Sequence, residues 1–265
     1  VSESRGLGDV YKRQIFNIDA EVKESAHARV NLIGEHTDYT GGYVMPTLLS
    51  FKNTIEISQN NSNEFTVYSQ HFKEKKTFND LKKSTNNEWV DYIKGCLHIF
   101  FYENKISSRF LNIFIASDIP LERGISSSSA LCVATLKALN TFFETKIKDP
   151  EIAKLAKKVE FNYIGVSGGI MDQMVSSIGI HGKAFFMNCK NLEYELINFP
   201  ENWKFCLIDS EVQRNLRDSS YNERFAELQE AEKKLGVEYL GGVKKENFEA
   251  DKFDNNTIAK RAKHV

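Results

Sequence analysis

The segment from residue 119 to residue 140, IPLERGISSSSALCVATLKALN, constrains the fold more than any other part of the chain. It joins a Pro/Gly turn to four consecutive serines and then to an amphipathic helix, in which Leu131, Ala134 and Ala138 recur at helical spacing. The first N–H groups of a helix lack intrahelical partners and carry the positive end of its dipole, so small residues there admit a phosphate. A single serine would be an ordinary N-cap, whereas four serines after a turn favour phosphate binding.

Several other classes of protein are not supported by the sequence. The serine-rich loop contains no lysine and does not match the Walker A pattern, and the HRD and DFG motifs of protein kinases are absent. The chain has 35 basic and 36 acidic residues and a net charge of −1, so neither nucleic acid nor a membrane is indicated as a partner. No apolar run approaches the roughly 18 residues that a membrane span needs.

The expected elements mix strands and helices without a regular βαβ alternation, which indicates an α+β fold. We expect strands near 15–22, 29–33, 51–57, 64–71, 109–116, 183–188 and 204–209. We expect helices near 88–102, 127–143, 150–164, 171–179 and 218–235. The polar turn QNNSN between 51–57 and 64–71 predicts a hairpin. Four widely spaced cysteines without a CxxC pair predict reduced, mostly buried thiols in a cytoplasmic protein: Cys96, Cys132, Cys189 and Cys206.

Acidic residues stand at three positions where solvation alone does not explain them. The stretch RVNLIGEHTDYTGG, residues 29–42, begins as an apolar strand and then presents Glu35, His36 and Asp38 before a glycine pair. Glu160 lies at the edge of the apolar stripe of a helix, and Asp172 falls in the first turn of another. Each acid alone would fit a cap or a surface position. Together with a phosphate loop they indicate Mg²⁺ and a base.

Four segments, in this order, resemble the galactokinases, within the wider GHMP group of small-molecule kinases that includes homoserine and mevalonate kinases. They are RVNLIGEHTDYTGGYVMP, EWVDYIKG, PLERGISSSSAL, and VEFNYIGVSGGIMDQ followed by SEVQRNLRDSSYNERFAELQEA. The resemblance covers residues 15 to 265 and implies a GHMP-kinase-like α+β fold. It implies an N-terminal mixed α/β kinase domain over 15–210 and the incomplete start of a C-terminal domain over 211–265. Residues 1–14 are expected to be a non-native leader.

The resemblance also implies roles for individual residues. Asp172 would be the catalytic base, with Arg29 beside it and near the transferred phosphoryl group. The residues implied to hold the sugar hydroxyls are Glu35, His36, Asp38, Gly169 and Tyr221. The residues implied to bind ATP are Trp89, Gly124, Ser126, Ser127, Ser128 and Ser129. Ser128 and Glu160 would hold Mg²⁺. The implied reaction is ATP-dependent phosphorylation of the anomeric hydroxyl of galactose, by a protein that is monomeric at full length.

Three departures from the family pattern bear on these roles. His27-Ala28 stands where the family has Pro-Gly, which suggests a remodelled turn before Arg29. Glu122-Arg123 and Ser129 replace small residues of the phosphate loop, where Arg123 would compensate the charge of Glu122. The late glycine-rich motif of the family is missing, so we expect a truncated chain with exposed apolar surface on 204–209, poor solubility and little activity.

Two alternatives to a galactose kinase stay open on the sequence. One is a related sugar 1-kinase acting on L-arabinose or N-acetylgalactosamine, although the string GEHTDYTGGYVMP favours galactose. The other is a sensor that binds galactose and ATP without phosphoryl transfer, because the changes in the serine loop leave that role open.

Overall fold

The computed structural model describes residues 15–86, 88–120, 123–209, 219–254 and 256–265. Its N-terminal part is built on one eight-stranded sheet with the order β2-β7-β3-β6-β4-β5, to which β1 adds by pairing with β3 and β8 by pairing with β7. The strands are β1 (Val22–Asn31), β2 (Tyr43–Val44), β3 (Pro46–Gln59), β4 (Phe65–Ser69), β5 (Glu74–Phe78), β6 (Leu111–Ser117), β7 (Lys183–Asn188) and β8 (Tyr194–Asn198).

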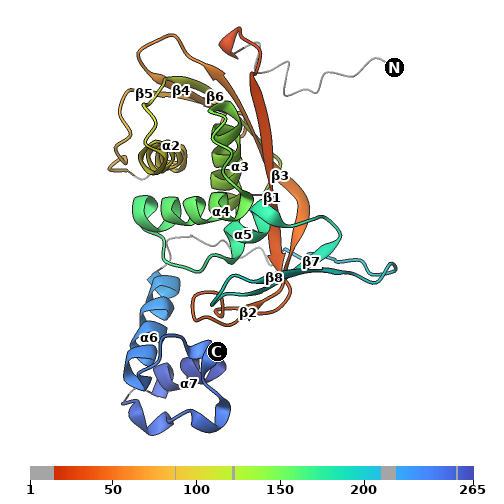
Figure 1. Cartoon of the computed structure of the whole chain (residues 1–265), viewed down its shortest axis with the longest axis vertical. Coiled ribbons are helices and arrows are strands. Elements are labelled where there is room, and N and C mark those ends of the chain that lie inside the picture. The colour runs from red at the N-terminus through yellow and green to blue at the C-terminus, as the bar shows by residue number, and fades with distance from the viewer. Residues whose placement is uncertain (1–14, 87, 121–122, 210–218, 255) are drawn as a thin grey trace.

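Helices pack on one side of the β1–β3 pair and meet at the centre of the molecule (Figure 1). They are α2 (Asp91–Asn104), α3 (Ser127–Phe142), α4 (Asp149–Lys158), the π-helix η1 (Val159–Ile164) and α5 (Met171–Ile178). The main core lies between these helices and the sheet. Ile55 and Ile57 of β3 lie on one face of the sheet and share this core with Leu97 of α2 and Leu136 of α3, all fully buried.

The C-terminal part is a small helical lobe at the lower end of the molecule (Figure 1). It comprises α6 (Ser219–Leu235), the 3₁₀ turns η2 (Leu240–Gly242), η3 (Lys245–Asn247) and η4 (Ala250–Lys252), and α7 (Asn256–His264). Leu228, Leu240 and Ile258 form its own core, and Tyr39 from the loop after β1 packs against it. The N–H of Gly241 donates to the carbonyl of Thr40 at 2.8 Å, so this lobe holds that loop in place.

Most of the expected elements are present, and three expectations are wrong. The helices at 127–143, 171–179 and 218–235 match α3, α5 and α6 almost to the residue, although the domain boundary near 210 lies outside the described residues. The hairpin between 51–57 and 64–71 does not form, because β6 lies between β3 and β4, antiparallel to the first and parallel to the second.

The strands expected at 15–22 and 204–209 are also absent from the described part of the chain. Residues 15 and 16 are helical, and β1 begins only at Val22. Residues 204–209 form no regular secondary structure and pair with no strand of the sheet. Phe205, Leu207 and Ile208 are accordingly exposed. Of the four thiols, Cys96 and Cys132 are buried, Cys189 is partly buried, and Cys206 is exposed.

At His27-Ala28, where we expected a remodelled turn, the pairing of β1 with β3 has a bulge instead. The register of β1 against β3 shifts between His27 and Arg29, so Ala28 has no cross-strand partner there. Ala28 is fully buried beside Ile119 and Ile125. Directly after this irregularity, the Arg29 N–H donates to the carbonyl of Ile125 in the serine loop at 3.2 Å.

The helix expected over 150–164 changes pitch halfway. It is α-helical to Lys158 and then forms the π-helix η1, which ends at Ile164. Short π-helical turns often mark functional sites, and Glu160 lies in the first turn of this one. No helix in the described ranges is both long enough and apolar enough to span a bilayer.

The core defined above predicts a contrast within α2. Leu97 is fully buried, whereas Tyr102 is 73% exposed on the same helix. Leu97→Ala should lower the free energy of unfolding by about 2–5 kcal/mol, because it leaves a cavity in the main core. Tyr102→Ala should change it by no more than about 0.5 kcal/mol. Urea unfolding followed by circular dichroism measures both, and similar losses for the two variants would contradict the packing described.

Candidate active site

The centre of the site is an ion pair between Arg29, near the end of β1, and Asp172, in the first turn of α5. Arg29 Nε donates to Asp172 Oδ1 at 2.8 Å, and Nη2 donates to Oδ2 at 2.9 Å. Its remaining nitrogen, Nη1, donates to the Gly124 carbonyl at 2.9 Å. Burial acts to lower the pKa of Arg29. The negative charges of Asp172, Glu35 and Asp38 act more strongly in the opposite direction, so the pKa is raised overall. This two-pronged geometry is the strong form of an Arg–carboxylate pair.

The serines of the loop do not cap α3 but bind the two acids predicted at the site. Ser126 is the N-cap residue, with a left-handed φ of 62°, and its side chain makes no capping hydrogen bond. Its hydroxyl donates instead to Asp172 Oδ2. Ser128 donates to Glu160 Oε1 at 2.7 Å, and Ser129 donates to Glu160 Oε2 at 2.7 Å. The structure therefore rejects the reading of this run as an ordinary helix cap.

Glu160 is buried and receives three donors. Besides the two serines, the amide Nε2 of Gln173 donates to Glu160 Oε2. Burial raises the pKa of Glu160, while the hydrogen bonds from Ser128, Ser129 and Gln173 act in the opposite direction. Sequence reasoning missed Gln173, although it directly follows Asp172 on the same helix.

The loop between β1 and β2 brings the predicted sugar-binding residues beside this ion pair. Asp38 lies against Gly169, where any side chain would overlap the Asp38 carboxylate, so only glycine fits. The ring of Tyr221, from α6, lies 5.5 Å from that of His36. His36 Nδ1 is 2.7 Å from the hydroxyl of Tyr39, a partner that the sequence analysis did not identify.

The acids of this loop have different environments. Glu35 accepts a hydrogen bond from Asn31 Nδ2 at 2.9 Å. Burial and the nearby Asp172 raise the pKa of Asp38 to about 7, although Arg29 acts to lower it. Burial and Asp38 together also raise the pKa of Tyr221. Asp38 thus changes charge near neutral pH, in a position that faces both the base candidate and the arginine.

Two other predicted residues have different surroundings. Trp89 stacks on Phe72 with ring centroids 5.6 Å apart, and its Nε1–H donates to Glu74 at 2.7 Å. Its contact with a nucleotide stays a prediction. Arg123 pairs with Asp209 at 2.9 Å, and Glu122, whose charge it was expected to compensate, lies outside the described residues.

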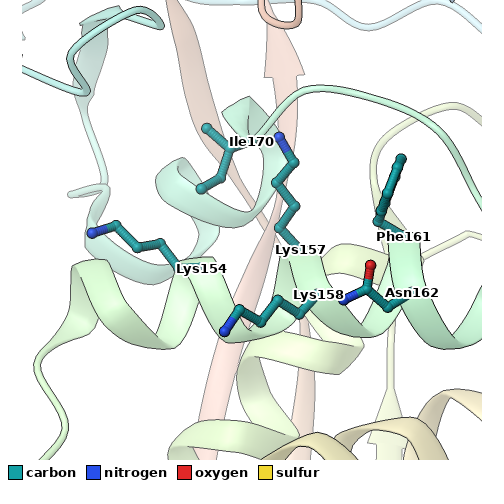
Figure 2. A pocket seen from close by; sticks show the side chains of 6 residues that line it. All are labelled: Lys154, Lys157, Lys158, Phe161, Asn162 and Ile170. Atoms are coloured by element: carbon teal, nitrogen blue, oxygen red, sulfur yellow. The ribbon is translucent and has the colours of Figure 1, made fainter. Parts of the chain in front are cut away.

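A hollow of about 300 Å³ lies beside α4 and η1 (Figure 2). Its walls come from Lys154, Lys157 and Lys158 of α4, Phe161 and Asn162 of η1, and Ile170. Lys154 and Lys158 are paired with Glu151 and Glu103. Lys157 reaches from α4 towards the segment that carries Ile170 (Figure 2). Burial lowers the pKa of Lys157, while the nearby Asp38 acts to raise it. The hollow is therefore a neighbour of the site rather than part of it.

Whether a divalent cation fits can be judged from the donor atoms. No cluster of three or more His, Cys, Asp or Glu residues that could hold a metal occurs among the residues that the structure describes. Ser128 and Glu160 nevertheless present a hydroxyl and a carboxylate oxygen 2.7 Å apart. Mg²⁺ is bound by oxygen donors, commonly by one or two carboxylates together with substrate phosphates, so these residues fit it.

Similarity to known protein families identifies the general class of this protein. The sequence matches the N-terminal domain of the GHMP kinases over residues 91–179 and the galactokinase galactose-binding signature over residues 13–59. The structure resembles that of the Methanococcus jannaschii mevalonate kinase, with a TM-score of 0.60 over 91% of this chain and 79% of that chain, at 20% identity. This likeness shows the GHMP kinase fold.

Relatives with higher sequence identity identify the family within this class. The galactokinase of Thermotoga petrophila is 36% identical over 92% of this chain and 68% of its own length. The galactokinase of Lactococcus lactis is 32% identical over 89% of this chain and 62% of its own length. A solved structure of the Lactococcus lactis enzyme complexed with galactose gives a TM-score of 0.86 at 30% identity, covering 97% of this chain and 69% of that chain. The chain belongs to the galactokinase family, and it spans about two thirds of the length of these relatives.

The environment of Asp38 predicts a pH-dependent effect on stability. The carboxyl of Asp38 has a pKa of about 7 in the folded chain, against the ordinary value of 3.8 for an aspartate. Between these values the folded state holds a proton that the unfolded state has lost, so the free energy of unfolding falls as pH rises. Asp38→Asn removes this titration, so the variant should gain stability relative to the wild type between pH 5 and pH 8. Urea midpoints across that range measure the difference, and a constant difference would refute it.

Proposed function

We propose that the protein phosphorylates the anomeric hydroxyl of galactose with ATP and Mg²⁺ and releases galactose 1-phosphate and ADP. One observation carries the proposal. The Arg29–Asp172 pair stands between the serine loop, through Gly124 and Ser126, and the Asp38–Gly169 contact that belongs to the predicted sugar site. A base and a cation are thus adjacent to both a phosphate-binding and a hydroxyl-binding surface, as phosphoryl transfer between two substrates requires.

Asp172 is the base of the proposed reaction. The anomeric oxygen of galactose attacks the γ-phosphorus of ATP, the bond to the β-phosphate oxygen breaks, and the hydroxyl proton passes to the Asp172 carboxylate. Arg29 and Ser126 orient that carboxylate through hydrogen bonds to both of its oxygens. The guanidinium of Arg29 also lies where negative charge accumulates on the transferred group, and such fixed charge stabilises the transition state.

The serine loop is the proposed seat of the nucleotide. Gly124 and the four serines Ser126, Ser127, Ser128 and Ser129 lie at the start of α3, whose N-terminal N–H groups suit phosphate oxygens. Trp89 is the proposed neighbour of the adenine. Mg²⁺, held by Ser128 and Glu160, would neutralise charge on the phosphates when bound.

The sugar site is proposed to consist of Glu35, His36, Asp38, Tyr221 and the backbone of Gly169. Carboxylates accept directional, charge-assisted hydrogen bonds from sugar hydroxyls. Each hydroxyl of the correct sugar satisfies a polar group that would otherwise be buried without a partner, so an epimer is disfavoured.

The organisation of the protein completes the proposal. Residues 15–210 are assigned to the N-terminal kinase domain and residues 211–265 to a C-terminal domain. A cytoplasmic location and a monomeric state at full length are part of the same proposal. Support comes from the separate core of the helical lobe and the four unpaired cysteines.

A substrate panel tests this function on a version of the protein that carries the complete C-terminal domain. ATP turnover should be highest with D-galactose, and kcat/KM with glucose should be about 10- to 100-fold lower, as the loss of about 1–3 kcal/mol for an unpaired buried group implies. Preference for L-arabinose or N-acetylgalactosamine would instead indicate the related kinases. Saturable galactose binding without turnover of any sugar would indicate a sensor.

A substitution at Asp172 tests the mechanism. Asp172→Asn keeps the shape of the side chain and one acceptor for Arg29, but removes the base, so kcat should fall by about 10²- to 10⁴-fold. Galactose binding, measured by titration calorimetry, should persist. Asp149→Asn is the matched control, since Asp149 lies at the start of α4 and pairs with Lys137 at 3.4 Å. Turnover by Asp172→Asn equal to that of this control would remove Asp172 from the mechanism.

A further inference from the structure

The two oxygens of Glu160 differ in how firmly they are held. Oε1 accepts from Ser128 at 2.7 Å. Oε2 accepts from Ser129 at 2.7 Å and also from Gln173 Nε2. Gln173 Nε2 further lies 3.4 Å from Ser129 Oγ, so three side chains from α3, η1 and α5 form one closed network. All of them are buried.

The orientation of the Gln173 amide follows from the partners it has. An ionised carboxylate only accepts hydrogen bonds, so the NH₂ end of the amide has to face Glu160. The other end, Oε1, is then buried and has no hydrogen-bond partner in the part of the chain that the structure describes. A buried acceptor without a donor is unfavourable unless a water or ligand satisfies it, so the network has one acceptor left unused.

We propose that Ser129 and Gln173 are positioning residues for Glu160, which fix its Oε2 so that Oε1 and the Ser128 hydroxyl remain available to a divalent cation. An ion that approaches the Ser128–Glu160 pair displaces a single hydrogen bond, and the carboxylate keeps its orientation through Oε2. Hydrogen-bond partners of metal ligands commonly set metal affinity in this way. The inference rests on the proposed use of Mg²⁺ and ATP.

Ser129 gives this chain a feature of its own. In the family pattern that this loop resembles, alanine stands in place of Ser129, and alanine cannot donate a hydrogen bond to Glu160. With alanine there, only Gln173 would hold Oε2. Ser129 therefore adds to the phosphate loop a hydroxyl that donates to the acid.

The test measures cation binding directly rather than turnover. Electron paramagnetic resonance of Mn²⁺, titrated into the chain with a non-hydrolysable ATP analogue, gives the dissociation constant of the bound ion. Ser129→Ala and Gln173→Leu should each weaken Mn²⁺ binding about 10-fold, at the low end of the effect seen for such partners. Ser129→Thr keeps the hydroxyl and should stay within about twofold of the wild type.

The control is Ser177→Ala on α5. Ser177 is buried like Ser129, and its hydroxyl donates to a backbone carbonyl, that of Asp149, at 2.8 Å. The Mn²⁺ affinity of the Ser177→Ala variant should equal that of the wild type. This result separates an effect on Glu160 from the general loss of a buried hydroxyl. Thermal unfolding of each variant verifies that it is folded. If Gln173→Leu does not fold, the comparison of Ser129→Ala with Ser129→Thr tests the inference by itself.

The outcomes are distinguishable. Mn²⁺ affinities of Ser129→Ala and Gln173→Leu within twofold of the wild type would overturn the inference and leave the proposed function intact. Equal weakening of Ser129→Thr and Ser129→Ala would also overturn it, because the effect would then come from packing and not from the hydroxyl. A wild-type chain that binds no Mn²⁺ with the analogue would remove the proposed use of Mg²⁺ and ATP, and the inference with it.

Discussion

The hydrogen-bonded ion pair of Arg29 and Asp172 is the interaction on which the site depends. It joins β1 to α5 across 143 positions of sequence, and the same guanidinium binds the Gly124 carbonyl. Burying an arginine is unfavourable unless its donors are used, and here three of its nitrogens have acceptors. The bulge at Ala28 and the left-handed backbone of Ser126 both belong to the geometry that brings the three segments together.

The three acids near this pair are stabilised in different ways. Asp172 faces a cation, and Glu160 is surrounded by neutral donors. Asp38 is dominated by burial and by its neighbour Asp172, which is why its pKa rises to about 7. Such different environments give chemically alike groups different properties at the same pH. The differences arise from the partners each acid meets, since all three are ordinary carboxylates.

Local patterns predicted local structure well. The amphipathic spacing in 127–143 and the turn before it led to α3, and the glycine pair before 171–179 led to α5. Strand pairing was harder to predict from the sequence. A polar turn indicates where the chain reverses, but it does not indicate which strand will pair with the next one. β6 pairs with β3 and with β4 and so excludes the expected hairpin. Residues 204–209 have the apolar character of a strand, yet they remain outside the sheet.

The residue types of the site were evident in the sequence by itself: Arg29, Asp38, Glu160, Asp172 and the serine run all stand out from their surroundings. Only the tertiary structure decided how they are paired. It assigned Ser126 to Asp172, and Ser128, Ser129 and Gln173 to Glu160, where the sequence left capping as an alternative. The physical reason is that a hydroxyl at a helix start has equally good local partners, and it turns to a distant carboxylate only when the packing of other elements buries that carboxylate beside it.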